Sequence, residues 1–332
     1  MIQVDAGSAP APVAKPRSVA AHVEDLALAA MEAAERGDLD ETERLARQAL
    51  SIARRLGGGS RVDALLSRSL RPLATAQRAR GQYPEAERTF RRALTSASVA
   101  FGSESLEAAE LHNDLGMTLK YMGRFAEADA AYGRARAILE SVPDVDPEDL
   151  AALFHNVGGL AYARGDFETA EPLARRATEI RSRALGERAT ATLLDRSAHA
   201  AILYGLGRIY EAEASIRDLL GDLEAALGSD HPEVAVALNN LAAIRLARGE
   251  LVEAAALFRR VIEIREFRHG QDSATLAVPL NNLARVLALQ GRTAEAAALY
   301  DRAIDLLEPS VDEGQPNLLA IRRNAARLSR PG

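Results

Sequence analysis

Hydrophobic positions along this chain recur every three or four residues, in runs that are separated by single glycines. That spacing places the apolar side chains on one face of a helix, so each run predicts an amphipathic α-helix. The runs come in pairs: around Gly249, Val234–Arg248 predicts one helix and Leu251–Phe267 predicts its partner. Glycine suits the junction because it adopts positive φ without steric cost and lets the chain reverse.

The paired pattern repeats with a fixed period. Six junction glycines stand 42 residues apart, and Gly37 precedes the first of them by 44. A period of this size is typical of helical units that stack, each burying its apolar face on the next, so we expect about seven helix pairs. The six glycines are Gly81, Gly123, Gly165, Gly207, Gly249 and Gly291.

Within the second helix of each pair, a small residue and a larger one recur at fixed positions. An alanine stands five residues after the glycine, as in Ala86 and Ala254, and a glutamate usually precedes it. A larger side chain such as Phe90 or Phe258 follows four residues later, on the same helical face. We expect the helices to approach closely at the alanines and the larger groups to fill the remaining space.

A second series of glycines marks the joints between pairs. After Gly228, the run Ser229-Asp230-His231-Pro232 predicts a new helix with proline at its first position. His231 is therefore predicted to be a cap or turn residue and not a metal ligand. The series is Gly102, Gly186, Gly228 and Gly270.

These features resemble the tetratricopeptide repeat, in the longer form found in kinesin light chains. The resemblance rests on Leu238-Asn239-Asn240-Leu241-Ala242 before Gly249 and on Leu280-Asn281-Asn282-Leu283-Ala284 before Gly291. It covers residues 18–310 and implies an all-α fold, a right-handed α-solenoid of antiparallel helix pairs that we treat as one domain. The chain departs from the pattern by lacking tryptophan and by placing Pro72 and Ser197-Ala198 where other copies have asparagine.

The ends of the chain are predicted to differ from the array. Residues 1–17 hold three prolines among alanines and predict a disordered leader without the apolar core of a signal peptide. The first helix is expected to begin at Ser18, a good N-cap residue. Residues 311–332 are expected to form a C-terminal capping helix, Asn317–Leu328, and a tail.

Three prolines fall inside predicted helices: Pro72, Pro172 and Pro279. Because proline removes a backbone hydrogen bond and clashes with the preceding turn, each such helix is expected either to kink or to begin later than the pattern indicates.

Composition narrows the classes of function. The net charge of −6 gives no general basic field, so nucleic acid is not an expected partner. No apolar run approaches the roughly 18 residues that a membrane span needs, and we expect a cytoplasmic protein. The absence of cysteine excludes disulfides, thiol nucleophiles and cysteine zinc sites. We expect no cofactor and no metal.

In the tetratricopeptide family the first helix of each pair lines a concave groove, where asparagines hold the backbone of an extended peptide. The resemblance therefore implies a protein or peptide partner bound at paired positions of the first helices. An amide suits this role because it both donates and accepts hydrogen bonds. Structural bracing between neighbouring helices is the alternative for the same residues. The pairs are Arg71/Pro72, Asn113/Asp114, His155/Asn156, Ser197/Ala198, Asn239/Asn240 and Asn281/Asn282.

Helical spacing places further side chains on this face. Arg71 and Arg78 could together grip a carboxylate of the partner by forked hydrogen bonds. Tyr162 and Tyr204 stand one period apart and could form an aromatic wall. Solvated arginines and ordinary packing between repeats are the alternatives. The other residues predicted on this face are Arg68, Glu110, Met117, Lys120, Tyr121, Val236, Leu246, Val278 and Arg285.

Catalysis is not the function that we predict. The six histidines are scattered, and the glycines mark turns and not a phosphate loop or a dinucleotide fingerprint. The alternative is an accessory or biosynthetic enzyme, or a substrate-holding factor, in which His155 and Asp114 act as an acid–base pair near Glu110 and Lys120. A self-assembling structural module is a third possibility, and the oligomeric state is left open.

Overall fold

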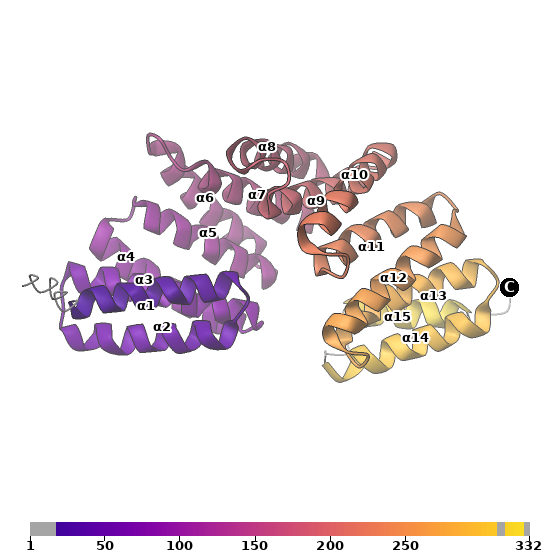
Figure 1. Ribbon diagram of the computed structural model, residues 1–332, viewed down its shortest axis with the longest axis horizontal. Helices are drawn as coiled ribbons and strands as arrows, with labels where there is room; N and C mark the ends of the chain where they lie inside the picture. The colour runs from indigo at the N-terminus through magenta and orange to yellow at the C-terminus, as the bar shows by residue number, and fades with distance from the viewer. Residues whose placement is uncertain (1–17, 311–315, 329–332) are drawn as a thin grey trace, which may run out of the picture. The chain divides into compact units, whose positions relative to one another are not determined.

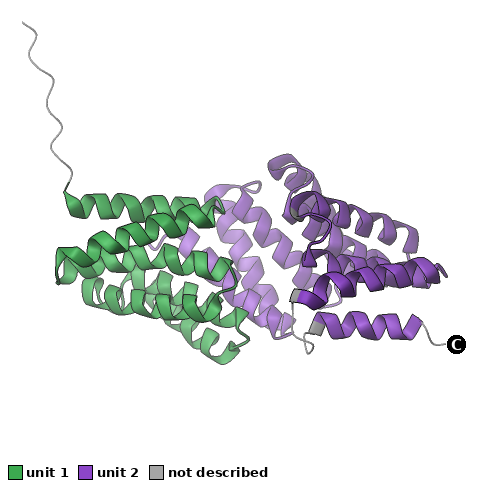
Figure 2. Ribbon diagram, turned by 90° about the horizontal axis from the view of Figure 1, so that it is seen from below, with its two compact units in different colours: residues 1–143 green, residues 144–332 purple. Residues whose placement is uncertain are grey.

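The computed structural model describes residues 18–310 and 316–328, which form fifteen α-helices and three short 3₁₀ helices, with no strand among them (Figure 1). The predicted all-α solenoid of antiparallel helix pairs is confirmed. The chain divides into two compact units, unit 1 (Met1–Pro143) and unit 2 (Asp144–Gly332), which Figure 2 colours separately. The leader predicted at 1–17 and the residues around the capping helix, 311–315 and 329–332, lie outside the described residues.

Unit 1 holds three helix pairs. In each pair the two helices pack together, and the first helix also contacts the first helix of the next pair. The helices are α1 (Val19–Glu35), α2 (Leu39–Ala53), η1 (Arg54–Leu56), α3 (Ser60–Ala79), α4 (Tyr83–Phe101), α5 (Leu106–Tyr121) and α6 (Phe125–Ser141).

Unit 2 continues the same alternation of first and second helices and ends on a first helix without a described partner. Its helices are α7 (Pro147–Ala163), α8 (Phe167–Leu185), α9 (Thr190–Gly205), α10 (Ile209–Leu227), α11 (Pro232–Ala247), α12 (Leu251–His269), η2 (Ala274–Leu276), α13 (Ala277–Leu289), α14 (Thr293–Leu307), η3 (Glu308–Ser310) and α15 (Pro316–Leu328).

The turns between helices have the backbone conformation that the glycines predict. All seven junction glycines have positive φ, as at Gly249 with 77°, and so do the four joint glycines. Asp144 stands 42 residues after Gly102 and before Gly186, at the missing place in the joint series. It too has a positive φ, 57°, which aspartate tolerates better than most residues.

The repeated small and large positions form the core. The six alanines of the series, including Ala86 and Ala254, are fully buried, and Phe90 and Phe258 beside them are at most 1% exposed. In α5, Gly116 leaves room for the Tyr132 ring, since a Cβ at Gly116 would lie 2.7 Å from that ring. Close approach at small residues, with large groups between them, is therefore confirmed.

The glutamates that precede these alanines have a surface role. In three repeats the glutamate accepts from the arginine that directly follows the junction glycine, at 2.6 Å in the pairs Arg124–Glu127, Arg208–Glu211 and Arg292–Glu295. Exposed pairs of this kind add little stability individually. They join the first turn of α6, α10 and α14 in the same way.

Two predicted caps are confirmed. Ser18 accepts from the Ala21 amide at 3.1 Å, and His231 Nδ1 accepts from the Glu233 amide at 3.2 Å. The three prolines are accommodated differently. Helix α3 continues through Pro72 and α8 through Pro172, whereas α13 begins later than the pattern indicates, after η2, with Pro279 at its third residue.

Helix α15 lies where the capping helix is predicted. Leu318 and Ile321 are buried against the last pair. Arg322, by contrast, stands 42 residues after the buried Leu280 and forms an ion pair with Glu308 at 2.5 Å. Helix α15 therefore has buried apolar residues like those of a first helix, but Arg322 occupies the position at which α13 has the core residue Leu280.

Candidate functional site

The paired positions singled out in the sequence lie on the first helices α3, α5, α7, α9, α11 and α13. We call the two residues of each pair ladder position one and ladder position two. Helix α15 continues the series, because Arg323 and Asn324 stand 42 residues after Asn281 and Asn282.

In unit 2 the asparagines bond to one another across neighbouring first helices. Asn282 Nδ2 donates to Asn239 Oδ1 at 3.4 Å, and Asn324 Nδ2 donates to Asn281 Oδ1 at 2.9 Å. Both contacts join ladder position one of a first helix to ladder position two of the next, residues 43 apart. We call such a contact a rung. Bracing between helices is therefore present for these asparagines.

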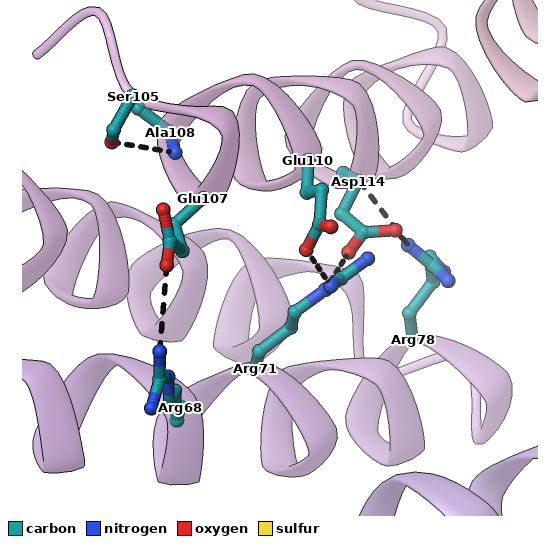
Figure 3. A network of polar contacts seen from close by, with 8 residues as sticks. All are labelled: Arg68, Arg71, Arg78, Ser105, Glu107, Ala108, Glu110 and Asp114. Carbon is teal, nitrogen blue, oxygen red and sulfur yellow. Dashed lines mark hydrogen bonds and ion pairs between the residues drawn. The ribbon is translucent and has the colours of Figure 1, made fainter. Parts of the chain in front are cut away.

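Unit 1 has a rung of the same spacing but of different chemistry. Arg71 Nε, at ladder position one of α3, donates to Asp114 Oδ2, at ladder position two of α5, over 2.9 Å. Arg71 also bonds Glu110, and Arg78 donates to the Asp114 carboxylate at 3.3 Å, as Figure 3 shows. The arginines predicted to grip a partner's carboxylate are thus engaged with carboxylates of the neighbouring helix, which stand one turn apart and face them.

Asp114 is only 7% exposed. Burial alone raises the pKa of its carboxyl group, but the guanidinium groups of Arg71 and Arg78 outweigh burial and hold the pKa below its usual value of 3.8. The four charged groups Arg71, Arg78, Glu110 and Asp114 balance one another within unit 1.

Histidine replaces asparagine in the next part of the series. Ala198, at ladder position two of α9, offers His155 no polar side chain, and His155 Nδ1 lies 2.7 Å from Asp195 Oδ1, one turn earlier on α9. Arg181 of α8 donates to the same oxygen at 2.8 Å. The Asp195 side chain is fully buried, whereas that of His155 is 36% exposed.

One rung of unit 2 is open. By the same spacing Ser197 would pair with Asn240, but the serine side chain is short and buried. The Asn240 amide makes no side-chain hydrogen bond with any described residue, although it is only half buried. Among the ladder asparagines of α11 and α13, Asn240 therefore keeps its full capacity to donate and accept.

The first helices α1, α3 and α5 of unit 1 enclose a pocket of about 600 Å³, within the range typical of ligand pockets. Two of its apolar residues are unusually open for leucine: Leu28 is 62% exposed and Leu106 is 38% exposed. The remaining apolar lining is Ala27, Met31 and Leu111, and the polar lining is Glu24, Asp25, Ser67, Arg68, Arg71, Glu107 and Glu110.

Lys120 lies on the same helix as Asp114 but forms no ion pair with any described residue. Its ammonium group stands 5.3 Å from the centre of the Tyr121 ring. Burial, and secondarily the positive charge of Arg78, lower the pKa of Lys120 below its usual value of 10.5. This lysine is a partly desolvated cation beside a charge network that is already balanced.

The other predicted residues are placed as follows. Tyr162 is 45% exposed and packs edge-on against Phe167 with ring centres 5.5 Å apart. Tyr204 is half buried against the core of unit 2. Asn156 is buried and Asn113 half buried, and both have polar contacts. Arg285 is exposed and has no ion pair among the described residues.

Several site residues escaped the sequence reasoning. Asn324 could have been found by extending the 42-residue series beyond Asn282. Glu24 and Asp25 of the pocket were not predicted, because the first copy is shifted by two residues relative to the 42-residue period. Asp195 and Glu107 lie one or two turns away from the ladder positions, and only the packing of adjacent helices brings them to His155 and Arg68.

Sequence profiles described as tetratricopeptide repeat match most of the array. One matches residues 65–141 and 196–266, and a second matches residues 150–188 and 280–308. The chain belongs to the tetratricopeptide repeat family. The kinesin-light-chain-like form of the repeat, predicted from the period, is also supported by the structural relatives. A search of curated protein sequences gives no match.

Solved structures of tetratricopeptide repeat proteins share the fold at low sequence identity. A Rap protein complexed with competence and sporulation factor is 14% identical, with a TM-score of 0.71 over 93% of this chain and 85% of its own. The apo quorum sensor NprR of B. thuringiensis is 13% identical, with a TM-score of 0.69 over 95% and 84%. BtubC (BKLC) of P. vanneervenii is 20% identical, with a TM-score of 0.54 over 72% and 94%.

The described residues hold neither a metal-binding cluster nor a helix that could span a membrane. No group of three histidine, aspartate or glutamate side chains in 18–310 and 316–328 is arranged to hold a metal ion. No helix in the same ranges is both long enough and apolar enough to cross a bilayer.

Proposed function

We propose that this repeat protein is a scaffold or regulator that holds an extended peptide or partner segment on the face formed by its first helices. A protein-binding role in general is supported by the family and by the Rap and NprR relatives. The observation that carries the finer proposal is the pocket between α1, α3 and α5, where Leu28 and Leu106 remain open to solvent.

An exposed leucine side chain is unfavourable in water, and its burial against a partner stabilises the complex. Leu28 and Leu106 come from the first and third helix pairs and line one pocket. A single bound segment would therefore contact both. Three first helices would hold it, and their relative positions are fixed by the core alanines and by the rung between Arg71 and Asp114.

The test is selection of binders from a random peptide library displayed on phage, with the full chain as bait. Selected peptides are then titrated against Leu28→Asn. We expect about a tenfold loss of affinity, the consequence of exposing one large apolar contact.

Val99→Asn is the matched control, because Val99 is 60% exposed, lies on the second helix α4 and does not line the pocket. Peptides that bind both variants equally well would place the site elsewhere.

The enzyme alternative depends on His155 and Asp114 acting together. Each has another partner: His155 is bonded to Asp195, and Asp114 is held by Arg71 and Arg78. A carboxylate that is paired with two arginines is a weak proton acceptor. We therefore propose the binding function in place of this acid–base pair.

A further inference from the structure

The pocket between α1, α3 and α5 has an excess of negative charge. Four carboxylates and two guanidinium groups line it. One of the guanidinium groups, Arg71, is engaged by Glu110 and by Asp114 from outside the lining. Asp25 has an interaction of its own, so the remaining charges are those of Arg68 against Glu24 and Glu107.

Arg68 satisfies these carboxylates poorly. Its guanidinium group lies 3.5 Å from Glu107 and 3.9 Å from Glu24, at the long end of ion-pair distances. The side chain is 48% exposed, and its charged end also stands 5.3 Å from the centre of the Phe101 ring. A second cation could bind Glu24 and Glu107 without breaking a short ion pair.

The apolar part of the same pocket adjoins these carboxylates. Leu28 stands one turn after Glu24 on α1, and Leu106 directly precedes Glu107 on α5. A ligand that fits must therefore present an aliphatic group and a positive charge within one or two residues of each other. An acidic segment would meet like charge at the rim and lose the hydration of its own carboxylates.

Resting on the function proposed above, we propose that the occupant of this pocket is a cationic, aliphatic segment of a partner protein. A leucine, isoleucine or methionine side chain of the segment packs on Leu28 and Leu106, and a neighbouring lysine or arginine pairs with Glu24 and Glu107. Charge complementarity supplies the discrimination between segments, and the aliphatic contact supplies most of the affinity.

The experiment uses the peptides selected from the random library and a double variant, Glu24→Gln with Glu107→Gln. We expect the selected peptides to combine lysine or arginine with an aliphatic residue and to bind more weakly as salt rises. The double variant should weaken their binding about fivefold, as expected for two partly exposed ion pairs.

The control double variant is Asp129→Asn with Glu168→Gln, two exposed carboxylates of α6 and α8 that do not line the pocket. It removes the same net charge and should leave affinity unchanged. Circular dichroism of all variants checks that they remain folded.

Three results would overturn the inference in different ways. Acidic or uncharged peptides that need Leu28 but not Glu24 and Glu107 would refute the cationic segment and leave the binding function standing. Peptides indifferent to Leu28 would refute both. A chain that dimerises in light scattering, and dissociates on Leu28→Asn, would show that the occupant is a second copy.

Discussion

The rungs of the two units have the same spacing but opposite chemistry. In unit 1, Arg71 and Asp114 are charged, and Arg78 and Glu110 complete a balanced network. In unit 2, Asn239 with Asn282 and Asn281 with Asn324 join equivalent positions by neutral amides. Where a rung forms, it therefore needs a complementary polar pair and not a particular residue.

The difference has an energetic consequence. A half-buried amide that loses its partner can still be hydrated, whereas a buried carboxylate or guanidinium group that loses its partner becomes an uncompensated charge. Unit 1 is therefore expected to be much more sensitive to loss of a rung than unit 2, although the helices and their spacing are the same.

The largest effect is expected for Asp114→Ala. It leaves Arg78, whose side chain is only 13% exposed, without a carboxylate partner among the described residues. We expect a loss of about 3 kcal/mol in the free energy of unfolding, measured by urea denaturation of the full chain. Asp129→Ala, at an exposed carboxylate of α6, is the control and should change little. Equal losses in the two variants would contradict the importance of the charged rung.

The charged rung also predicts a dependence on pH that the amide rungs lack. Because the pKa of Asp114 is lowered in the folded chain, its stabilising contribution is complete above 3.8, the usual value, and is lost as pH falls through the folded pKa. Acid titration of unfolding should therefore show a smaller loss of stability in Asp114→Asn than in the native chain. Parallel curves for the two proteins would exclude this carboxylate as a source of acid sensitivity.

Within unit 2, Asn282 and Asn240 occupy the same register one repeat apart and form a matched pair. Asn282→Ala removes contacts to Asn239 and Asn281 and should cost about 1 kcal/mol. Asn240→Ala removes no side-chain hydrogen bond to a described residue and should leave the free energy of unfolding unchanged.

Peptide binding provides a second comparison of Asn240 with Asn282. If an asparagine of α11 clamps a partner's backbone, Asn240 is the one with all of its side-chain groups free of hydrogen bonds to described residues, so Asn240→Ala should weaken binding of a peptide selected for unit 2. A peptide that is weakened by Asn282→Ala alone would show that the rungs, and not the open amide, control the bound state.

The smallest change in the free energy of unfolding is expected for a substitution of Lys120, on α5. Because the pKa of Lys120 is lowered by burial and by Arg78, stability should rise with pH between the lowered value and 10.5, where the folded chain binds fewer protons than the unfolded chain. Lys120→Met should remove that rise and gain about 0.5 kcal/mol at neutral pH. An unchanged pH profile would show that Lys120 is fully hydrated.

Much of the fold followed from local rules. The junction glycines, the capping roles of Ser18 and His231, the buried alanines and the C-terminal helix were all predicted, because turn geometry, capping and helical periodicity depend on neighbouring residues. The late start of α13 at Ala277 was one of two outcomes left open for Pro279, and local propensity could not choose between them.

The candidate site was predicted less completely. Arg71, Arg78 and Asp114 were predicted to lie on one face that binds a partner. Their bonds to one another depend on how far apart α3 and α5 lie. The pocket was missed because its parts, Leu28 on α1 and Leu106 on α5, are far apart in the chain and are not in the same register.

The 42-residue period, read from the sequence alone, is enough to predict which residues occupy equivalent positions on successive first helices, since the turn glycines recur at that period. Tertiary structure decided which of those residues meet. Adjacent first helices are offset so that ladder position one faces ladder position two, 43 residues on, and a side chain of a few ångströms reaches only the group placed opposite it. That offset is a property of helix packing. It places Asn240 opposite the short Ser197 side chain, so that its amide stays without a side-chain hydrogen bond to any described residue, whereas Asn239 and Asn281 lie opposite asparagines and bond to them.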